Sequence, residues 1–203
     1  MICVRVLACY ESPVDGDTID PRLDDPAVVE AEYQSEARLV RRRLDYWASF
    51  EGENPEDVVV QAAREVKPRR VLEVGCGTGG FAVRLATDHQ ADVVALDSSP
   101  RLVELTRARG IETRQGDVQR LPFDDDEFDC VVANWMLYHV PDLDRGLSEI
   151  ARVLCPDGRL VATTNSREHL REVWELVGRE IAPLSFDAEN GATRVQQFFA
   201  SVS

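Results

Sequence analysis

Four glycines within six positions are the first feature of the sequence suited to binding a ligand. Gly75, Gly77, Gly79 and Gly80 follow the apolar run VLEV and precede a stretch with helical spacing. Glycine lets a backbone adopt positive φ angles and approach a ligand closely, and three of the four satisfy the G-x-G-x-x-G spacing of dinucleotide-binding turns. The alternative is a tight turn between a strand and a helix, without any ligand. Because so many glycines are costly in conformational entropy, we interpret this glycine loop (residues 75–80) as a binding loop.

A carboxylate closes the next apolar run. Asp97 ends the stretch VVALD and lies 22 positions after Gly75. An acid at the end of the second strand of a nucleotide-binding fold accepts hydrogen bonds from ribose hydroxyl groups. Alternatively, Asp97 caps the helix expected from Pro100, although Ser98 or Ser99 would serve equally well. Its distance from the glycine loop favours the ribose-binding role.

Two further loops carry polar groups. Asp117 follows the segment IETRQG, where its carboxylate is suited to accept a hydrogen bond from the exocyclic amine of an adenine; a turn aspartate is the alternative. Farther along, the run from Asn134 to His139 changes from apolar strand residues to the polar and aromatic residues of a pocket wall. His139 is the best-placed base if a substrate must lose a proton. The alternative is that its ring packs against Tyr138.

These loops connect short apolar runs that alternate with helical stretches. The expected strands cover residues 71–75, 92–97, 111–117, 128–135 and 158–165. The expected helices cover residues 80–87, 100–109, 142–154, 167–181 and 188–202. This alternation predicts a doubly wound α/β fold, with a mostly parallel sheet of five strands and helices on both faces. Ligands of such sheets bind at the carboxyl ends of the strands, where the loops above lie.

The N-terminal part of the chain has a different pattern. Its first ten residues have strand propensity, but the acid- and turn-rich stretch that follows leads us to predict an N-terminal tail over 1–26. Helical spacing predicts a lid or cap over 27–66, and the main domain over 67–203. Tyr33, on the lid, is a candidate for contact with a substrate.

Composition excludes several classes of protein. The 203 residues carry 37 acidic and 23 basic side chains, a formal net charge of −14, which disfavours nucleic acid and anionic membranes as partners. No run approaches the roughly 18 apolar residues of a membrane span. The five cysteines are an odd number and lack C-x-x-C spacing. This pattern indicates reduced thiols in a cytoplasmic protein, with neither a disulfide framework nor a metal site.

Four segments of the sequence together resemble the class I S-adenosylmethionine-dependent methyltransferases, a Rossmann-like family, and in particular its branch that acts on small molecules. They are VLEVGCGTGG, VVALDSS, GDVQRLPFDDDEFDCVVANWMLYH and LSEIARVLCPDGRLVATTN, in family order over about residues 69–165. The turn that begins at Cys155 departs from the usual lysine and second glycine, but it is remote from the cofactor. The resemblance implies methyl transfer to a small-molecule acceptor by in-line displacement, in which positioning contributes most of the catalysis.

The resemblance also implies a role for each loop. The cofactor S-adenosylmethionine would be held by Glu73, Gly75, Cys76, Gly77, Asp97, Ser98, Asp117, Val118 and Asn134. Asp97 would bind the ribose hydroxyls with Ser98 beside the adenine, whose amino group Asp117 would take. Glu73 would approach the methionine amine through water, and Asn134 would contact the methionine end through its backbone carbonyl.

The acceptor would lie over the sulfonium, near Met136, Tyr138 and His139, with Tyr33 contributed by the lid. Two other interpretations stay open. The G-x-G-x-x-G spacing also suits a nicotinamide-dependent oxidoreductase, which Glu73 and the acid after the third strand disfavour. A truncated or inactive relative would instead bind the cofactor, or nothing, and serve as an interaction module.

The resemblance further implies two more strands after residue 165, an antiparallel pair at one edge of the sheet. The sequence ends at FFASVS, where a sixth strand would begin. We therefore expect a sheet without strands six and seven, whose fifth strand has an exposed edge. Such an edge predicts a homodimer formed through it.

Overall fold

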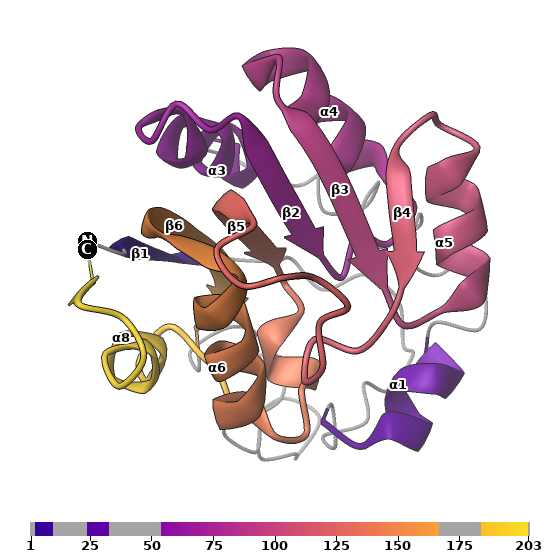
Figure 1. The fold of residues 1–203 in the computed structure, drawn as a ribbon. Helices are drawn as coiled ribbons and strands as arrows, with labels where there is room; N and C mark the ends of the chain where they lie inside the picture. The colour runs from indigo at the N-terminus through magenta and orange to yellow at the C-terminus, as the bar shows by residue number, and fades with distance from the viewer. Residues whose placement is uncertain (1–2, 10–23, 33–53, 167–183, 203) are drawn as a thin grey trace.

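The protein is built on one parallel sheet. The computed structural model describes residues 3–9, 24–32, 54–166 and 184–202. Its strands are β1 (Cys3–Cys9), β2 (Arg70–Val74), β3 (Asp92–Asp97), β4 (Glu112–Gln115), β5 (Phe128–Asn134), β6 (Leu154–Asn165) and β7 (Ser201–Val202). They lie in the order β4-β3-β2-β5-β6-β1-β7, and their pairings are parallel (Figure 1). The order reverses between β2 and β5, which is where doubly wound sheets bind their ligands.

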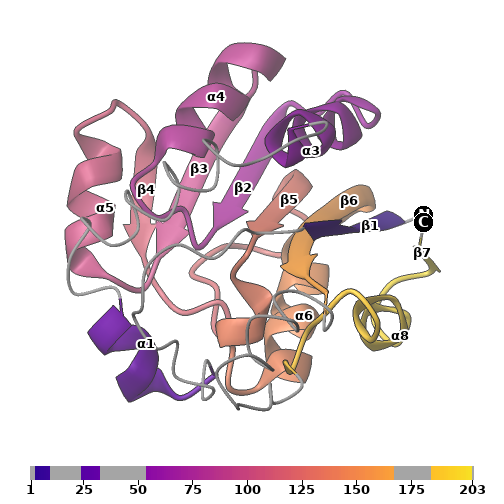
Figure 2. The same ribbon diagram turned by 180° about the vertical axis from the view of Figure 1, so that it is seen from behind.

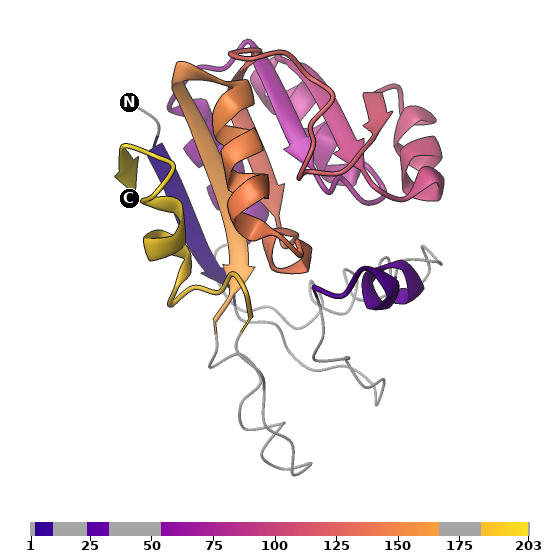
Figure 3. The same cartoon turned by 60° about the horizontal axis from the view of Figure 1, so that its bottom comes forward.

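Helices cover both faces of this sheet. They are α1 (Pro26–Glu32), α3 (Pro55–Arg64), α4 (Gly80–His89), α5 (Pro100–Arg107), the 3-10 turn η1 (Leu137–His139), α6 (Leu143–Val153) and α8 (Gly191–Val195). α3 and α4 pack on the face that carries Val71 and Val132, whereas α6 and α8 pack on the face that carries Leu72 and Val131. Figure 2 shows α8 beside β1 and β7, and Figure 3 shows α6 in front of the sheet. Strands buried on both faces explain the near-continuous apolar runs of the sequence.

The predicted α/β class and the parallel sheet are confirmed. The five expected strands correspond to β2 to β6, with small shifts at their ends. β4 is shorter than expected, and β6 begins at Leu154 rather than at residue 158. β6 thus follows α6 directly, and its first residue, Leu154, pairs with Phe128 of β5.

The sheet differs from the prediction at one edge, where two strands extend it to seven. Residues 3–9, which were assigned to the N-terminal tail, form β1 beside β6, with Cys3 opposite Arg159 and Cys9 opposite Asn165. β7 pairs in turn with β1. The backbone groups of β6 need partners, and the segment CVRVLAC has the strand propensity to supply them. β6, the fifth predicted strand, is therefore paired on both sides, and the prediction of an exposed edge there is wrong. The prediction of a homodimer depended on that edge and loses its argument.

The predicted lid over 27–66 includes two described helices, α1 and α3, which lie in different parts of the structure. α1 lies beyond the carboxyl ends of β3 and β4 (Figures 1 and 3), with Val28 and Val29 only half-buried. Residues 33–53, which include Tyr33, lie outside the described residues. α3 does not belong to a lid, because Val59 and other apolar side chains of this helix are fully buried against the sheet.

The C-terminal part is also only partly as predicted. Within the segment 188–202, α8 covers Gly191–Val195, and Ser201–Val202 form β7. The predicted helix over 167–181 lies outside the described residues. None of the helices that the structure describes is long and apolar enough to span a membrane.

An ion pair on α6 anchors the loop between β4 and β5. The Arg152 guanidinium meets both carboxylate oxygens of Glu149 at 2.8 Å. It also donates to the carbonyl oxygens of Leu121 and Phe123 at 3.1 and 2.9 Å, and Glu149 accepts the amide of Leu121 at 2.8 Å. These contacts tie to α6 the loop that follows Asp117. The hydrogen bonds from Arg152 hold the pKa of Glu149 below its ordinary value.

We expect Glu149→Gln to lower the free energy of unfolding at pH 7 by about 1 kcal/mol, since it breaks a partly exposed, two-pronged ion pair. The folded state lowers the pKa of Glu149. Its contribution is therefore present above the unfolded-state pKa and is lost as the pH falls through the folded-state pKa. Urea unfolding of both proteins between about pH 7 and pH 3 should show the difference shrinking. The matched control is Glu104→Gln in the exposed pair with Arg101, which should change stability little at any pH. A Glu149→Gln difference that stays constant with pH contradicts the prediction.

Candidate functional site

The glycine loop follows β2 at the switch point and is held against β3. Gly75, Gly77 and Gly79 have φ angles of +69°, +55° and +75°, which side chains other than glycine rarely tolerate. The amides of Gly75 and Cys76 donate to the carbonyl oxygen of Leu96 at 2.8 and 3.1 Å. The loop thus turns sharply from the end of β2 into α4, with its course set by the neighbouring strand.

Asp97 ties three loops together. Its Oδ2 accepts the amide of Gly77 at 2.9 Å, and its Oδ1 accepts the amide of Ser99 at 2.9 Å. Its carbonyl oxygen accepts the amide of Gly116, after β4, at 3.0 Å. The helix-cap alternative is wrong, because the N-cap of α5 is Ser99, whose hydroxyl accepts the amide of Leu102.

Asp97 is only 7% exposed, and burial of its carboxyl group raises its pKa, whereas hydrogen bonds from the amides of Ser99, Gly77 and Ser98 oppose that shift. A carboxylate has about four lone-pair positions, so it keeps accepting capacity for a ligand beside its 2.9 Å hydrogen bonds to the amides of Gly77 and Ser99. A pair of ribose hydroxyls, each donating one hydrogen bond, requires a carboxylate with such accepting capacity.

α5 holds the glycine loop from the other side. Thr106 is fully buried, and its hydroxyl donates to the carbonyl oxygen of Gly77 at 3.2 Å. Arg109 donates to the carbonyl oxygen of Thr78 at 2.8 Å. The peptide groups flanking Gly77 are therefore fixed by Asp97 on one side and Thr106 on the other. Sequence reasoning missed Thr106, since a threonine on an amphipathic helix has no distinguishing spacing.

We expect Thr106→Val to weaken binding of S-adenosylhomocysteine about tenfold, because the Gly77 carbonyl loses its buried donor. Thr106→Ser should restore most of the affinity. The matched control is Thr113→Val, which removes a similar hydroxyl-to-carbonyl bond on β4, away from the loop. Calorimetric titration and urea unfolding should show comparable stability losses for both valine variants, with an affinity loss only at position 106. Equal affinity of the two variants contradicts a positioning role for Thr106.

Cys76, within the glycine loop, has a buried side chain. Its thiol is buried against the Thr106 hydroxyl at 3.5 Å, and burial raises its pKa further above the ordinary value of a thiol. Its amide donates to Leu96 and its carbonyl oxygen accepts the amide of Gly79. The thiol and both main-chain groups of Cys76 are thus engaged within the protein, and its contact with a cofactor stays a prediction. Cys76, Cys130 and Cys155 are free thiols.

The predicted adenine-side residues lie at the ends of β3 and β4. Ser98 is exposed, and its carbonyl oxygen accepts the side-chain amide of Gln115 at 3.2 Å. Asp117 is exposed, and its carboxylate accepts both the backbone and side-chain amides of Gln119. Val118 is buried in the core. Because Gly116 bonds to Asp97, the predicted ribose and adenine residues are neighbours.

A strained turn follows β5. Trp135 has a φ of +49°, which is rare for a bulky side chain, and its amide donates to the Thr163 carbonyl oxygen at 3.1 Å. The turn brings Met136 against the glycine loop, since a Cβ added to Gly75 would lie 2.8 Å from the Cβ of Met136. The structure therefore brings the predicted substrate residue Met136 beside the predicted cofactor loop.

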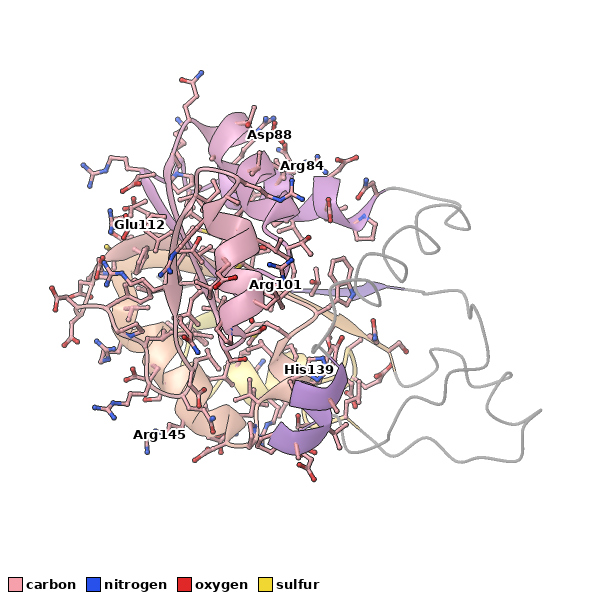
Figure 4. All side chains as sticks on the ribbon, turned by 90° about the vertical axis from the view of Figure 1, so that its right-hand side faces the viewer. Arg84, Asp88, Arg101, Glu112, His139 and Arg145 are labelled. Atoms are coloured by element: carbon pink, nitrogen blue, oxygen red, sulfur yellow. The ribbon has the colours of Figure 1, made fainter. Side chains whose placement is uncertain are left out.

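η1 carries the predicted base. Tyr138 is buried and His139 is half-buried, and their ring centroids lie 4.4 Å apart. Figure 4 shows His139 in the lower half of the molecule, whereas Asp88 of α4 lies near its top. The packing of His139 on Tyr138 that the alternative interpretation predicted is observed, and the role of His139 as a base stays a prediction.

Strand pairing aligns further polar side chains on one face at the carboxyl ends. Glu73 lies opposite Val132, and Asn134 lies opposite Thr163. Since side chains alternate along strands, Glu73, Asn134 and Thr163 share the face covered by α3 and α4, as does Asp97. A parallel sheet with a glycine loop at its switch point and a buried carboxylate at the end of the next strand is the arrangement typical of nucleotide-binding α/β proteins.

Comparisons with known proteins narrow this class. Residues 72–162 match the family model described as a methyltransferase domain. An uncharacterized methyltransferase of Mycobacterium tuberculosis is 37% identical over 122 residues, which are 57% of this chain and 49% of that protein. Demethylmenaquinone methyltransferase of Deinococcus radiodurans is 40% identical over 101 residues, 46% of this chain and 42% of that protein. Among solved structures, an S-adenosylmethionine-dependent methyltransferase from Thermotoga maritima superposes with a TM-score of 0.55 at 27% identity, covering 70% of this chain and 69% of that one.

Residues 72–162, somewhat less than half of the chain, therefore match the methyltransferase domain family, and the fold resembles that of a solved methyltransferase. The chain spans about half the length of the curated relatives named above. The matched segment contains the glycine loop, Asp97, Asp117 and the turn after β5. The resemblance drawn from the sequence is thus confirmed at the level of the family.

Proposed function

We propose that this protein transfers a methyl group from S-adenosylmethionine to a small-molecule acceptor. The observation that carries the proposal is the buried carboxylate of Asp97. It fixes the glycine loop through the amide of Gly77 and keeps accepting capacity for ribose hydroxyls. The match of residues 72–162 to the methyltransferase domain family supports the same cofactor.

The residues present fit this cofactor. The glycine loop turns through positive φ angles at Gly75, Gly77 and Gly79, and the Asp97 carboxylate accepts the amide of Gly77. We propose that Asp97 binds the ribose, Ser98 flanks the adenine, and Asp117 and Val118 bind its polar edge. Glu73, on the same sheet face, would serve the methionine amine.

When bound, S-adenosylmethionine supplies a methyl group on a positively charged sulfur atom, which is already electrophilic. The protein therefore contributes mainly position. We propose that Met136 and Tyr138 border the acceptor, together with Tyr33, and that Asn134 presents its backbone carbonyl to the methionine end. His139 would accept a proton from an acceptor that must lose one.

A small-molecule acceptor is supported by the relatives. One of them, by its name, acts on demethylmenaquinone. The net charge of −14 also disfavours nucleic acid as the acceptor, because it repels a phosphate backbone.

Calorimetric titration of the folded chain with S-adenosylhomocysteine tests the proposal. We expect a dissociation constant in the micromolar range, a binding free energy of about −8 kcal/mol, and no binding of NADH in a parallel titration. A folded chain that binds neither compound contradicts the proposal and favours an interaction module. Transfer of a labelled methyl group from S-adenosylmethionine to any compound in a pooled metabolite screen would exclude an inactive relative.

A further inference from the structure

Two buried side-chain atoms at the ends of β5 and β6 have no hydrogen-bond partner among the described residues. They are Nδ2 of Asn134, a donor, and Oδ1 of Asn165, an acceptor. A buried polar atom left unpaired costs about 1–3 kcal/mol, and both belong to uncharged amides. A ligand that offers one acceptor and one donor would satisfy the two atoms together.

The Asn134 amide is held in a single orientation. The Thr163 hydroxyl donates to Asn134 Oδ1 at 3.0 Å and accepts the amide of Trp135 at 3.2 Å. With its oxygen engaged by Thr163, the amide directs its nitrogen away from that hydroxyl. The main chain of Asn165 is also fixed, because its carbonyl oxygen accepts the amide of Ala188 at 3.0 Å.

Strand register places the two amides on one face. Asn134 lies opposite Thr163, and Asn165 is two residues beyond Thr163 on β6, so the side chains of all three residues share a face. Strand geometry puts the Cα atoms of Asn134 and Asn165 about 8 Å apart. The ribose residue Asp97 ends β3, on the other side of β2 from these two strands. The amide pair therefore lies on the far side of Glu73 from the ribose, where an acceptor approaches the methionine end.

We infer that Asn134 and Asn165 form the polar wall of the acceptor pocket and select an uncharged acceptor. This inference rests on the proposed function. The acceptor would carry a carbonyl or hydroxyl oxygen for Asn134 Nδ2 and an N–H or O–H group for Asn165 Oδ1. A carboxylate has no hydrogen to give Asn165 and meets the acidic Glu73 on the same face. An ammonium group has no lone pair for Asn134.

Three probes of equal size and different charge test the inference: benzamide, benzoate and benzylammonium. With the protein saturated by S-adenosylhomocysteine, ligand-observed NMR titrations should show benzamide binding at least tenfold more tightly than either ion. Asn165→Leu should weaken benzamide at least tenfold. Asn134→Asp, which keeps an oxygen for Thr163 and removes the donor, should do the same without disturbing the fold. Asn165→Leu should leave the affinity for S-adenosylhomocysteine within about twofold of wild type.

The outcomes separate this inference from the proposed function. Failure to bind S-adenosylhomocysteine overturns the proposed function itself. If the cofactor product binds but benzamide does not, or the three probes bind equally, the inferred selectivity is wrong. Unchanged benzamide affinity in Asn165→Leu also overturns the inference. A large loss of S-adenosylhomocysteine affinity in Asn134→Asp would assign that amide to the cofactor instead.

Discussion

Asp97→Ala is expected to weaken binding of S-adenosylhomocysteine at least 100-fold. The substitution removes the acceptor for two ribose hydroxyls, and a hydrogen bond to a charged group contributes about 1.5–3 kcal/mol. It also leaves the partly buried amides of Gly77 and Ser99 without their acceptor, which loosens the glycine loop. Calorimetric titration measures the loss, and circular dichroism verifies that the variant is folded.

The matched control lies on the same strand. Asp92 begins β3 as Asp97 ends it, and its side chain is 57% exposed and paired with Arg70. Asp92→Ala should leave the affinity within about twofold of wild type, because this carboxylate lies at the opposite end of the strand. If folded Asp97→Ala retains an affinity within tenfold of wild type, Asp97 does not hold the ribose.

Gly79→Ala is expected to cause the largest loss of stability, about 3 kcal/mol or more. A Cβ at this position would lie 2.6 Å from the Oγ1 of Thr106 and 2.9 Å from its Cα, which belongs to the backbone of α5. The positive φ of +75° adds strain of about 1–2 kcal/mol for a residue with a side chain, and overpacking adds about 1–3 kcal/mol. Urea unfolding at neutral pH measures the change.

Gly110→Ala separates the cost of backbone strain from the cost of steric overlap with α5. Gly110 has a φ of +84°, but nothing lies within 4 Å of an added Cβ. This variant should therefore lose only the strain component, about 1–2 kcal/mol. Equal losses for the two variants would show that α5 moves away from the glycine loop at little cost, and that Thr106 does not fix it.

Periodicity and spacing were sufficient to predict the core of the fold. Strands buried on both faces must be apolar throughout, so β2, β3 and β5 were recognisable from their composition. The glycines at 75, 77 and 79 signalled the turn because positive φ angles favour glycine. Asp97 was recognisable from its distance to that turn. These features are local, and each depends on a few residues close together in the sequence.

Contacts between residues far apart in the sequence could be determined only from the tertiary structure. The place of β1 beside β6 depends on a pairing between residues about 150 positions apart, which no local pattern encodes. The same holds for the hydroxyl of Thr106 beneath Gly77, and for Asn134 held by Thr163 across two strands. A local sequence determines which residues can turn, cap or be buried. Which side chain meets which backbone group is determined only when the parallel strands take their register.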